Sequence, residues 1–464
     1  MTLCVVNVNI VCMTIWQPKL QESNVPLYRQ LANAIEQGIS SGCLLAGEKL
    51  PTHRDLADLL EINVSTVTRG YKEAEKRGIV AGTVGRGTYI SSDVGTSHSV
   101  VPHIPYMSGM IDLGLIMPLY HLDPDLKIAL KKLCRRQNLT ALMQYSEPCG
   151  TLEHRTIGAQ WAHSFGLDVT ADNIVVCSGA QHALNCALNG LFSPGDRIAA
   201  GYLTYPGMKS LCTMLGLRLV PVNMDESGMD ADNLDRICRR EKIKGLYLMP
   251  GVHNPTTTIL TKARREKLAQ VANTHELIVV EDDTYNLTNP QNALQQKSLI
   301  TGNGVYITGI SKALAAGLRV AFMAVATKYH QHIRKSLLNT IWMTPLLNVE
   351  IVSLWIKDGT ADAVITQKRE EAKTRFEIAK SILHNYNLKG IPTGFFIWLF
   401  LPPPWQGHTF EQHMRNLGVN VFGAEKFIVG DATAPPAIRI SLTGTQSTDE
   451  LIKGLKLIKQ ALDG

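Results

Sequence analysis

The stretch GVYITGISKALAAGLRVAFMAV, residues 304–325, places a lysine between two apolar runs. β-Branched and apolar residues lead to Gly309, small residues surround Lys312, and a second apolar run follows Arg319. This pattern predicts a strand, a tight loop and a second strand, with Lys312 projecting from the loop. A lysine in such a place is most often a solvated surface residue. Three other segments favour a chemical role instead.

These segments carry polar residues at the ends of predicted strands. Residues 178–181, SGAQ, follow one apolar run and open a helical pattern, and the backbone amides at a helix start can hold a phosphate. The stretch GLYLMPGVHN ends in Asn254, and ELIVVEDDTY contains Asp282 and Tyr285. In chain order the four segments supply a phosphate loop, an amide, an acid with a tyrosine, and a lysine with an arginine.

With these motifs in this order, most of residues 110–464 resembles the fold-type I pyridoxal 5'-phosphate (PLP) enzymes of the aminotransferase class. The resemblance implies that Lys312 forms an imine with the cofactor. It also implies that Asp282 keeps the pyridine nitrogen protonated, so that the ring acts as an electron sink. Asn254 and Tyr285 would hydrogen-bond the phenolic oxygen of the ring.

The same resemblance assigns residues to the cofactor phosphate, to the ring face and to a substrate. The phosphate would be held by Ala180, Gln181, Ser311 and Arg319. Tyr205, in LTYPG, would stack on the ring, and Arg439, in AIRISLTG, would bind a carboxylate as a bidentate pair. Taken singly, Tyr205 fits a core aromatic and Arg439 a surface cation, so the case depends on the joint order.

Three positions depart from the family pattern. Gly309 stands where many relatives carry a phosphate-binding serine or threonine, Ala316 replaces a frequent proline, and His182 replaces a frequent glutamine. We expect these changes to alter the phosphate contacts without abolishing cofactor binding. Tyr145, in MQYSEPCG, resembles a tyrosine that reaches the partner's active site in aminotransferase dimers.

Upstream of this region the sequence predicts a winged helix-turn-helix. Helical patterns cover 26–41 and 53–60, and a third begins at Asn63 or Ser65. Two short β-prone runs then flank a glycine-containing turn at 85–87, which predicts a hairpin. In a fold of this kind the second helix of the motif lies in the major groove of DNA.

The stretches LPTHRDLA, TVTRGY and GRGTYI resemble the GntR-type winged-helix domain. The resemblance implies DNA contacts from Arg54, Asn63, Ser65, Thr66, Thr68, Arg69 and Arg86. Arg54 and Arg86 would touch phosphates, whereas Asn63, Ser65 and Thr66 would lie nearest to base edges. Residues 17–91 hold 9 Lys and Arg against 8 Asp and Glu, and Val64 stands where many relatives are basic. A dimerisation or protein-binding module therefore stays open as an alternative.

Length and composition limit the class of protein. A chain of 464 residues is too long for one ordinary core, so two or three domains are expected. Nine cysteines without a CxxC pair suit a reducing cytosol and give no disulfide framework or metal site. The charge of +6 permits an anionic partner without requiring one. No segment reaches the roughly 20 apolar residues that span a bilayer, so a cytoplasmic protein without membrane contact is expected.

The sequence predicts a multi-domain chain: a mainly α winged helix with a β-wing, then an α/β PLP-dependent transferase domain of fold type I with a smaller α+β C-terminal part. Seven apolar runs alternate with helical patterns from residue 173 to 327, which predicts a mostly parallel sheet. The predicted boundaries are 13–91 for the winged helix, 92–110 for a linker and 111–464 for the PLP-binding domain, with large and small parts at about 165–330 and 340–464. Residues 1–12 are expected to be an extension.

A winged helix followed by a PLP fold resembles the MocR subfamily of GntR-type transcriptional regulators over nearly the whole chain. The resemblance implies a homodimer that binds double-stranded DNA and senses an amine or amino acid by transaldimination at Lys312, with Arg439 holding a carboxylate. The alternative is a catalytically active aminotransferase with an accessory DNA-binding domain, because every residue of the half-reaction is present. A third reading is a PLP carrier or a sensor of cofactor occupancy.

Overall fold

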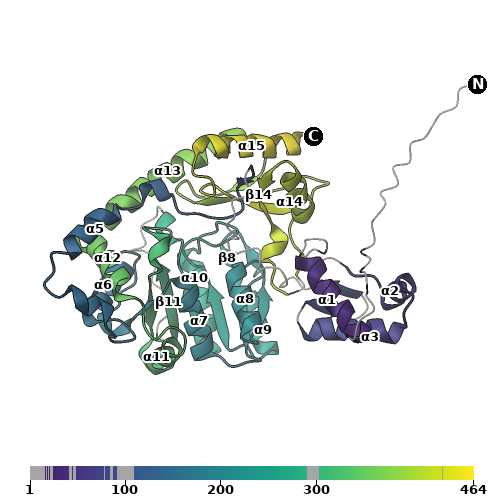
Figure 1. Cartoon of the computed structure of the whole chain (residues 1–464), viewed down its shortest axis with the longest axis horizontal. Coiled ribbons are helices and arrows are strands. Elements are labelled where there is room, and N and C mark those ends of the chain that lie inside the picture. Colours follow the sequence, from purple (N-terminus) through teal and green to yellow (C-terminus); the bar gives the residue numbers. More distant parts are fainter. Residues whose placement is uncertain are drawn as a thin grey trace, which may run out of the picture. The chain divides into compact units, whose positions relative to one another are not determined.

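The computed structural model describes residues 16, 18, 20, 25–40, 44, 49–77, 79–83, 87–90, 109–289, 302–430 and 432–464. They form two compact units, one within residues 1–98 and one within residues 99–464 (Figure 1). The tip of the predicted wing, with Arg86, and the predicted linker up to residue 108 lie outside the described residues.

The first unit is three helices followed by a hairpin. Its elements are α1 (Leu27–Ser40), α2 (His53–Leu60), α3 (Val64–Lys76), β1 (Val80–Thr83) and β2 (Gly87–Ile90). The side chains of Thr52 and Asn63 accept backbone N–H groups at the starts of α2 and α3, as helix caps do. Leu31, Leu56 and Val67, one from each helix, are fully buried. The predicted winged helix-turn-helix fold is confirmed.

The second unit is built on a seven-stranded sheet in the order β4-β12-β11-β10-β9-β5-β6. Its strands are β4 (Ile174–Cys177), β5 (Arg197–Gly201), β6 (Arg218–Val222), β9 (Gly245–Leu248), β10 (Ile278–Asp282), β11 (Gly304–Gly309) and β12 (Ala321–Val325). Only β12 runs antiparallel to its neighbours in this sheet, because a tight loop returns the chain directly from β11. The sheet is therefore mixed but mostly parallel, as predicted.

Helices cover both faces of this sheet (Figure 1). They are α5 (Leu126–Leu133), α6 (Leu152–His163), α7 (Ala180–Leu191), α8 (Pro206–Met214), α9 (Ala231–Arg240), α10 (Lys262–Thr274), α11 (His330–Leu338) and α12 (Leu346–Lys357). Successive side chains of β12 point to opposite faces of the sheet. Ala321 and Met323 pack with α7, α8 and α11 on one face, whereas Phe322 packs with α6 and α12 on the other. This three-layer arrangement is the α/β architecture that the sequence predicts.

A smaller α+β domain follows. Its elements are α13 (Thr360–Ile382), β13 (Leu388–Lys389), β14 (Phe396–Phe400), α14 (Gly407–Asn416), β15 (Val419–Asn420), β16 (Phe422–Gly423), β17 (Ala437–Ser441) and α15 (Thr448–Asp463). The strand β3 (Ile111–Asp112), at the start of the unit, pairs with β15. A short hairpin of β7 (Met224–Asp225) and β8 (Gly228–Met229) belongs to the large domain. Among the described helices, none has the length and apolar character needed to cross a membrane.

Candidate functional site

Three neighbouring strands bring the predicted site residues to one edge of the sheet. The strands β9, β10 and β11 lie side by side and run parallel. Asn254 follows β9, Asp282 ends β10, and Lys312 follows β11. Because ligands of open α/β sheets bind at the carboxyl ends of the strands, this edge is the expected place for a cofactor.

Lys312 lies in the turn between β11 and β12 and its side chain reaches inward. Its Nζ donates a hydrogen bond to the carbonyl oxygen of Ile116. Loss of water around the amine, with the charges of Arg439 and Arg319 nearby, lowers the pKa of Lys312 from 10.5 to about 8. A lysine with this pKa is uncharged near neutral pH far more often than an exposed one, which is what a nucleophilic amine requires.

Asp282 is a buried carboxylate held by neutral donors. The hydroxyl of Tyr247 donates to its Oδ2 over 3.0 Å, and the hydroxyl of Thr284 donates to its Oδ1 over 2.6 Å. Burial raises the pKa of Asp282, and these hydrogen bonds oppose that rise by favouring the charged form. A cationic ring nitrogen beside this carboxylate would favour the same charged form.

The residues expected to hold a phosphate lie together at the start of α7. Gly179 precedes the helix with φ +88°, and a Cβ placed on it would fall 2.4 Å from Nη2 of Arg319. The guanidinium therefore lies directly over the glycine, and its Nη1 donates to the hydroxyl of Ser311 over 3.0 Å. The backbone N–H groups of Ala180 and Gln181 lie in the first turn of α7, so no helix carbonyl precedes them as an acceptor. Helix amides, a hydroxyl and a guanidinium together make an anion site.

The side chain of Gln181 turns toward the predicted stacking tyrosine. The hydroxyl of Tyr205 donates to Oε1 of Gln181 over 3.2 Å, and Nε2 of Gln181 donates to the carbonyl of Gly207. Burial raises the pKa of Tyr205 to about 12, so its hydroxyl stays protonated at neutral pH. Gln181 can thus serve a phosphate through its backbone amide while its side chain fixes the ring of Tyr205.

Arg439, on β17 of the small domain, is buried among acceptors and aromatic rings. Its Nη1 donates to Oδ1 of Asn254 over 2.7 Å and its Nη2 to the carbonyl of Gly114 over 2.6 Å. The guanidinium lies 4.9 Å from the ring centre of Phe427. Its buried Nε has no hydrogen-bond partner among the described residues. Burial lowers the pKa of Arg439 to about 10, and an incoming carboxylate would oppose that effect.

Tyr285 completes the group of converging side chains. Its ring packs edge-on against Phe396, with centroids 5.2 Å apart. The guanidinium of Arg439 lies 5.8 Å from the centre of the same Phe396 ring, so Tyr285 and Arg439 approach one aromatic side chain. Burial raises the pKa of the Tyr285 hydroxyl.

Two of the departures from the family pattern have a visible local effect. Nδ1 of His182 accepts the backbone N–H of Ser178 over 3.1 Å, so the imidazole fixes the loop that precedes α7. A Cβ placed on Gly309 would meet the Cβ of Ala180 at 3.4 Å, an ordinary contact. A serine would fit there, and the glycine removes one hydroxyl from the phosphate side of the loop.

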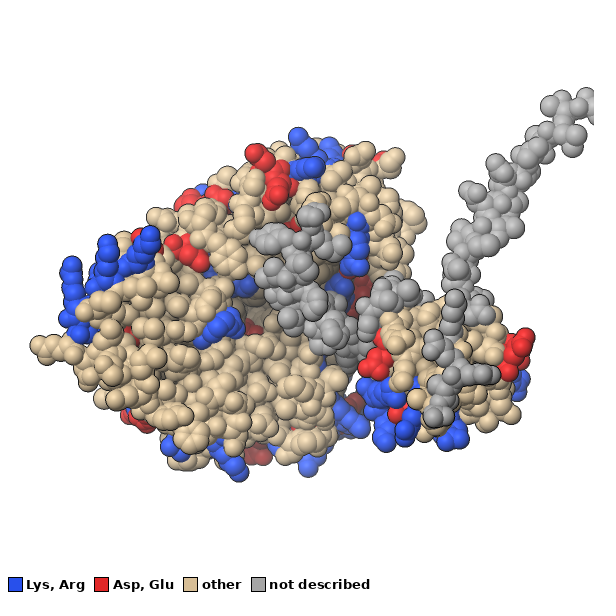
Figure 2. All heavy atoms as spheres, viewed as in Figure 1, with Lys and Arg blue, Asp and Glu red and all other residues tan. Residues whose placement is uncertain are grey.

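The predicted DNA-contact residues of the first unit have different surroundings. Arg54 and Ser65 are exposed, and Asn63 accepts from both the N–H and the hydroxyl of Ser65. Thr68 is half-buried, and its hydroxyl lies 3.2 Å from Nδ1 of His53 in α2. The guanidinium of Arg69 lies 4.4 Å from the ring centre of Tyr28. Thr66 is half-buried. Figure 2 shows Lys and Arg side chains gathered along the lower side of this unit.

Tyr145 lies on the surface of the second unit. It is 85% exposed, and its ring centre lies 5.9 Å from that of Trp342, which is also exposed. Within one chain the tyrosine thus faces outward rather than toward Lys312.

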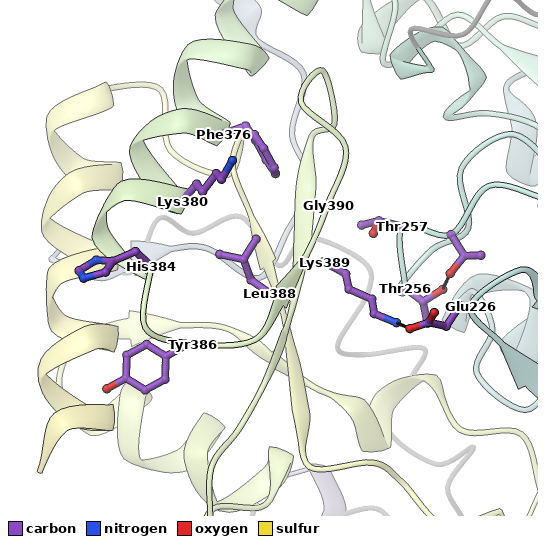
Figure 3. A pocket seen from close by; sticks show the side chains of 11 residues that line it. Glu226, Thr256, Thr257, Phe376, Lys380, His384, Tyr386, Leu388, Lys389 and Gly390 are labelled. Carbon is purple, nitrogen blue, oxygen red and sulfur yellow. Dashed lines mark hydrogen bonds and ion pairs between the residues drawn. The ribbon is translucent and has the colours of Figure 1, made fainter.

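A separate groove of about 630 Å³ lies between the loop after Asn254 and the small domain (Figure 3). One wall is formed by Thr256, Thr257, Thr258 and Glu226, and the other by α13 and β13. The ion pair of Lys389 with Glu226, 3.0 Å long, crosses it. None of the predicted cofactor residues lines this groove, so it is distinct from the Lys312 site.

Four participants in the site were missed from the sequence. Tyr247 and Thr284 contact Asp282, and the carbonyl groups of Gly114 and Ile116 contact Arg439 and Lys312 respectively. Tyr247 carried a usable signal, since it is a polar-tipped residue in a buried strand that neighbours the strand of Asp282. The carbonyl groups carried none, because every residue has one.

Both units of the chain match families of known proteins. Residues 109–455 match the family Aminotransferase class I and II, and residues 27–90 match Bacterial regulatory proteins, gntR family. The HTH-type transcriptional regulator YdeF of Bacillus subtilis (strain 168) is 33% identical over 449 residues, covering 97% of each chain. The chain belongs to the MocR subfamily of GntR-type regulators.

This MocR protein is also similar to a further regulator and to a solved structure. The vitamin B6 salvage pathway transcriptional repressor PtsJ of Salmonella typhimurium (strain LT2) is 26% identical over 444 residues, covering 94% of this chain and 98% of that one. The crystal structure of LysN, an α-aminoadipate aminotransferase of Thermus thermophilus, shares the fold with a TM-score of 0.69. It covers 80% of this chain and 94% of that one at 23% identity.

This MocR protein is therefore a DNA-binding regulator whose aminotransferase-like domain takes PLP as its cofactor. Its residues fit that group. The cradle over Gly179 suits a phosphate, the buried Asp282 suits a ring nitrogen, and the amine of Lys312 suits an aldehyde.

The lowered pKa of Lys312 leads to a prediction for cofactor uptake. Only the neutral amine attacks an aldehyde, so the rate at which PLP-free protein gains its visible absorption band should rise with pH to a plateau, with a midpoint at about 8. Arg439→Met removes a neighbouring cation and should move that midpoint upward. Stopped-flow absorbance measures both rates. A midpoint near 10.5, the value of an ordinary lysine, would mean that the amine is solvated.

Proposed function

We propose that this protein is a PLP-dependent transcriptional regulator that senses a primary amine, with an amino acid as the favoured class, by transaldimination at Lys312. The observation that carries the proposal is the convergence of the Lys312 amine and the buried Arg439 guanidinium on one short piece of backbone. Nζ of Lys312 donates to the carbonyl of Ile116 and Nη2 of Arg439 to the carbonyl of Gly114, two residues away, so the two groups lie close enough to act on one small ligand.

The residues of the chain have separable tasks in this function. When bound, PLP supplies an aldehyde carbon that bonds reversibly to a primary amine. Lys312 would be the amine bonded to this carbon when no effector is present. Its low pKa favours the neutral form of the amine, which is the form that bonds to an aldehyde. Asp282, fixed by Tyr247 and Thr284, would hold the ring nitrogen. Arg439 would hold the effector carboxylate as a bidentate pair.

Binding of the effector must favour one arrangement of the protein in order to alter DNA affinity. Arg439 lies in the small domain, whereas Asn254 and Lys312 lie in the large domain. A ligand bonded to the cofactor in the large domain and held by Arg439 would therefore join the two domains. We propose domain closure as the change that the effector favours.

The substitution Lys312→Ala tests the chemical assignment. The variant purified with PLP should lack the visible band of the wild type, because the chain then offers no amine to the aldehyde at this place. An absorption spectrum of the dialysed protein measures this, and Lys357→Ala, which changes an exposed lysine on α12, should keep the band. Retention of the band by Lys312→Ala would disprove the assignment.

A second function, a working aminotransferase, rests on the completeness of the site. The 2-aminoadipate transaminase of Thermus thermophilus is 27% identical over 282 residues, which cover 58% of this chain. Formation of a keto acid from an amino acid by the purified protein would support turnover.

For DNA binding we propose that α3 enters the major groove and that Arg54, at the start of α2, contacts a phosphate. Asn63, Ser65 and Thr66 would lie nearest to the bases, with Thr68, Arg69 and Arg86 as further contacts. The exposed basic residues of α3 and its C-cap support this placement, and they are Arg69, Lys72, Lys76 and Arg77.

The substitution Arg54→Ala tests this docking. Loss of one phosphate contact should weaken binding by about fivefold to tenfold at fixed salt and lower the salt slope by about 1. Fluorescence anisotropy with DNA selected by the protein from a random pool measures both quantities. Arg239→Ala makes the same change in net charge on the surface helix α9 and should leave affinity unchanged. Equal affinities for the two variants would contradict the docking.

We also propose a homodimer, and the exposed apolar side chains around Tyr145 support it. Met143, two residues before Tyr145, is 79% exposed, and Trp342, whose ring contacts that of Tyr145, is 54% exposed. Leu139 and Leu152, close by in the chain, are exposed as well. Exposed apolar residues that lie together are typical of a protein interface. A partner seated there would also allow the partner's Tyr145 to approach the site of this chain.

The substitution Met143→Glu should convert the dimer to monomer, because a buried unpaired carboxylate would oppose association. Light scattering coupled to size exclusion measures the mass at micromolar concentration. Met214→Glu is the control, since Met214 is 67% exposed on α8 and its change should leave the mass unaltered. A Met143→Glu variant that remains dimeric would place the interface elsewhere.

A further inference from the structure

The groove between the loop after Asn254 and the small domain contains a buried hydroxyl that no other described group uses (Figure 3). Thr257 lines this groove and is only 6% exposed. The hydroxyl groups of its neighbours Thr256 and Thr258 are hydrogen-bonded to each other over 3.0 Å, whereas that of Thr257 has no hydrogen-bond partner among the described residues. Buried polar groups are rarely left without a partner, so this hydroxyl is available to a ligand in the groove.

The backbone holds Thr257 in a conformation that favours glycine. Its φ is +62°, in the left-handed region where the branched Cβ of a threonine crowds the backbone. Two backbone hydrogen bonds close this turn: the N–H of Thr257 donates to the carbonyl of His253 over 2.8 Å, and the N–H of His253 donates to the carbonyl of Thr258 over 2.9 Å. The turn therefore fixes the direction of the Thr257 side chain, and a strained residue of this kind is a sign of function.

Two lysines of the small domain line the opposite wall. Lys380 lies near the end of α13 and has no ion pair or hydrogen bond among the described residues. Lys389, in β13, pairs with Glu226 across the groove over 3.0 Å. Glu226 is the only acid among the described residues that line the groove, and its side chain is 88% exposed. An exposed ion pair stabilises the fold little, so Lys389 can exchange Glu226 for a ligand that carries more negative charge.

Apolar side chains form part of the same wall. Phe376 and Lys380 are four residues apart on α13, so they share one face of the helix. Phe376 is 7% exposed, and Leu388, which precedes Lys389 in β13, also lines the groove. A Cβ placed on Gly390 would lie 2.8 Å from the ring of Phe376, so the glycine leaves room for that ring. The groove therefore offers ammonium groups next to apolar surface.

These donors suit a phosphate group better than a carboxylate. Ammonium and hydroxyl groups donate singly, as a tetrahedral phosphate requires, whereas the planar guanidinium fork matches a carboxylate. No arginine is among the described residues that line the groove. A phosphate monoester carries a charge of about −1.5 to −2 at neutral pH, enough to meet two lysines. The groove volume of about 630 Å³ lies within the range of about 300–1,000 Å³ that small-molecule sites occupy.

We propose that this groove binds a phosphate monoester with an apolar organic part, through Thr257 of the large domain and Lys380 and Lys389 of the small domain. The phosphate would displace Glu226 from Lys389 and accept from all three side chains. The organic part would cover Phe376. No predicted cofactor residue takes part, so this site is additional to the one at Lys312.

A ligand in the groove would hold the two domains together, because its donors come from both. Thr257 lies three residues after Asn254, whose Oδ1 accepts from Nη1 of Arg439 over 2.7 Å. One short turn thus joins the groove to the Lys312 site. Domain closure is the change proposed above for the amine, so a groove ligand would act on the same equilibrium, and this consequence rests on the proposed function.

Isothermal titration calorimetry of the full-length, PLP-loaded and dialysed protein tests the site with three probes of one skeleton: phenyl phosphate, phenyl sulfate and phenol. Bound PLP fills the phosphate-binding residues at α7, so the added probes report on other places. Phenyl phosphate should bind, phenyl sulfate at least about fivefold more weakly because it carries a single charge, and phenol without measurable heat. Absence of phenyl phosphate binding would overturn the site, and equal binding of the sulfate or of phenol would overturn its assignment to a phosphate.

Substitutions of the two lysines locate the bound ligand. Lys380→Ala and Lys389→Ala should each weaken phenyl phosphate binding at least about tenfold, because each removes a charged donor. Lys453→Ala is the matched control, since Lys453 is exposed on α15 and does not line the groove, and it should keep the affinity within about twofold. If the two lysine variants bind as tightly as this control, the ligand lies elsewhere and the proposal is wrong.

The hydroxyl is tested by two variants that differ only in that group. Thr257→Ser and Thr257→Ala both lose the γ-methyl and meet the same backbone conformation, so a folding defect would affect them alike. Thr257→Ala should bind phenyl phosphate about fivefold more weakly than Thr257→Ser does. Equal affinities would remove the large domain from the site and contradict the bridge between the domains.

Glu226→Gln should give a gain that a folding defect does not produce. It removes the acid that competes with the ligand for Lys389, so phenyl phosphate should bind about threefold more tightly. Glu266→Gln is the control, because Glu266 is an exposed acid that pairs with Lys262 on α10, and it should leave the affinity unchanged. A Glu226→Gln variant with the affinity of the wild type would contradict the displacement of Glu226.

Discussion

The burial of the Lys312 amine is the constraint on which the site depends. Lys312, Arg319 and Arg439 each donate to a neutral oxygen atom, that of a carbonyl, a hydroxyl and an amide respectively. Neutral acceptors satisfy hydrogen bonds and add no negative charge. The site therefore favours a ligand that brings negative charge, as a phosphate and a carboxylate do.

The sheet topology explains how so many groups meet there. The ends of β9, β10 and β11 supply an amide, an acid and an amine from segments far apart in the sequence. The reversed strand β12 then returns the chain through the turn that carries Lys312, Ser311 and Arg319. The sheet is buried on both faces, so its strand ends are held rigidly and the site inherits that rigidity.

Strand-end residues were predictable, and their partners were not. Asn254, Asp282 and Lys312 each follow an apolar run, so their common edge could be read from the sequence, as could the cap at Asn63. The pairing of Gln181 with Tyr205 could not, because it depends on a side-chain conformation set by a residue 24 positions away. The contacts of Arg439 with Gly114 and of Lys312 with Ile116 could not be foreseen either, since backbone carbonyl groups make them.

The two units have separate hydrophobic cores among the described residues: the cluster around Leu31 and Val67 shares no member with the cluster around Met323. Each core can thus lose its order without the other. Calorimetry of the intact chain would then contain two heat-absorption peaks instead of one cooperative transition. A ligand stabilises only the unit that binds it. Added PLP would therefore shift the peak of the second unit, and added double-stranded DNA would shift the peak of the first. The heat trace would in this way assign each ligand to its half of the molecule.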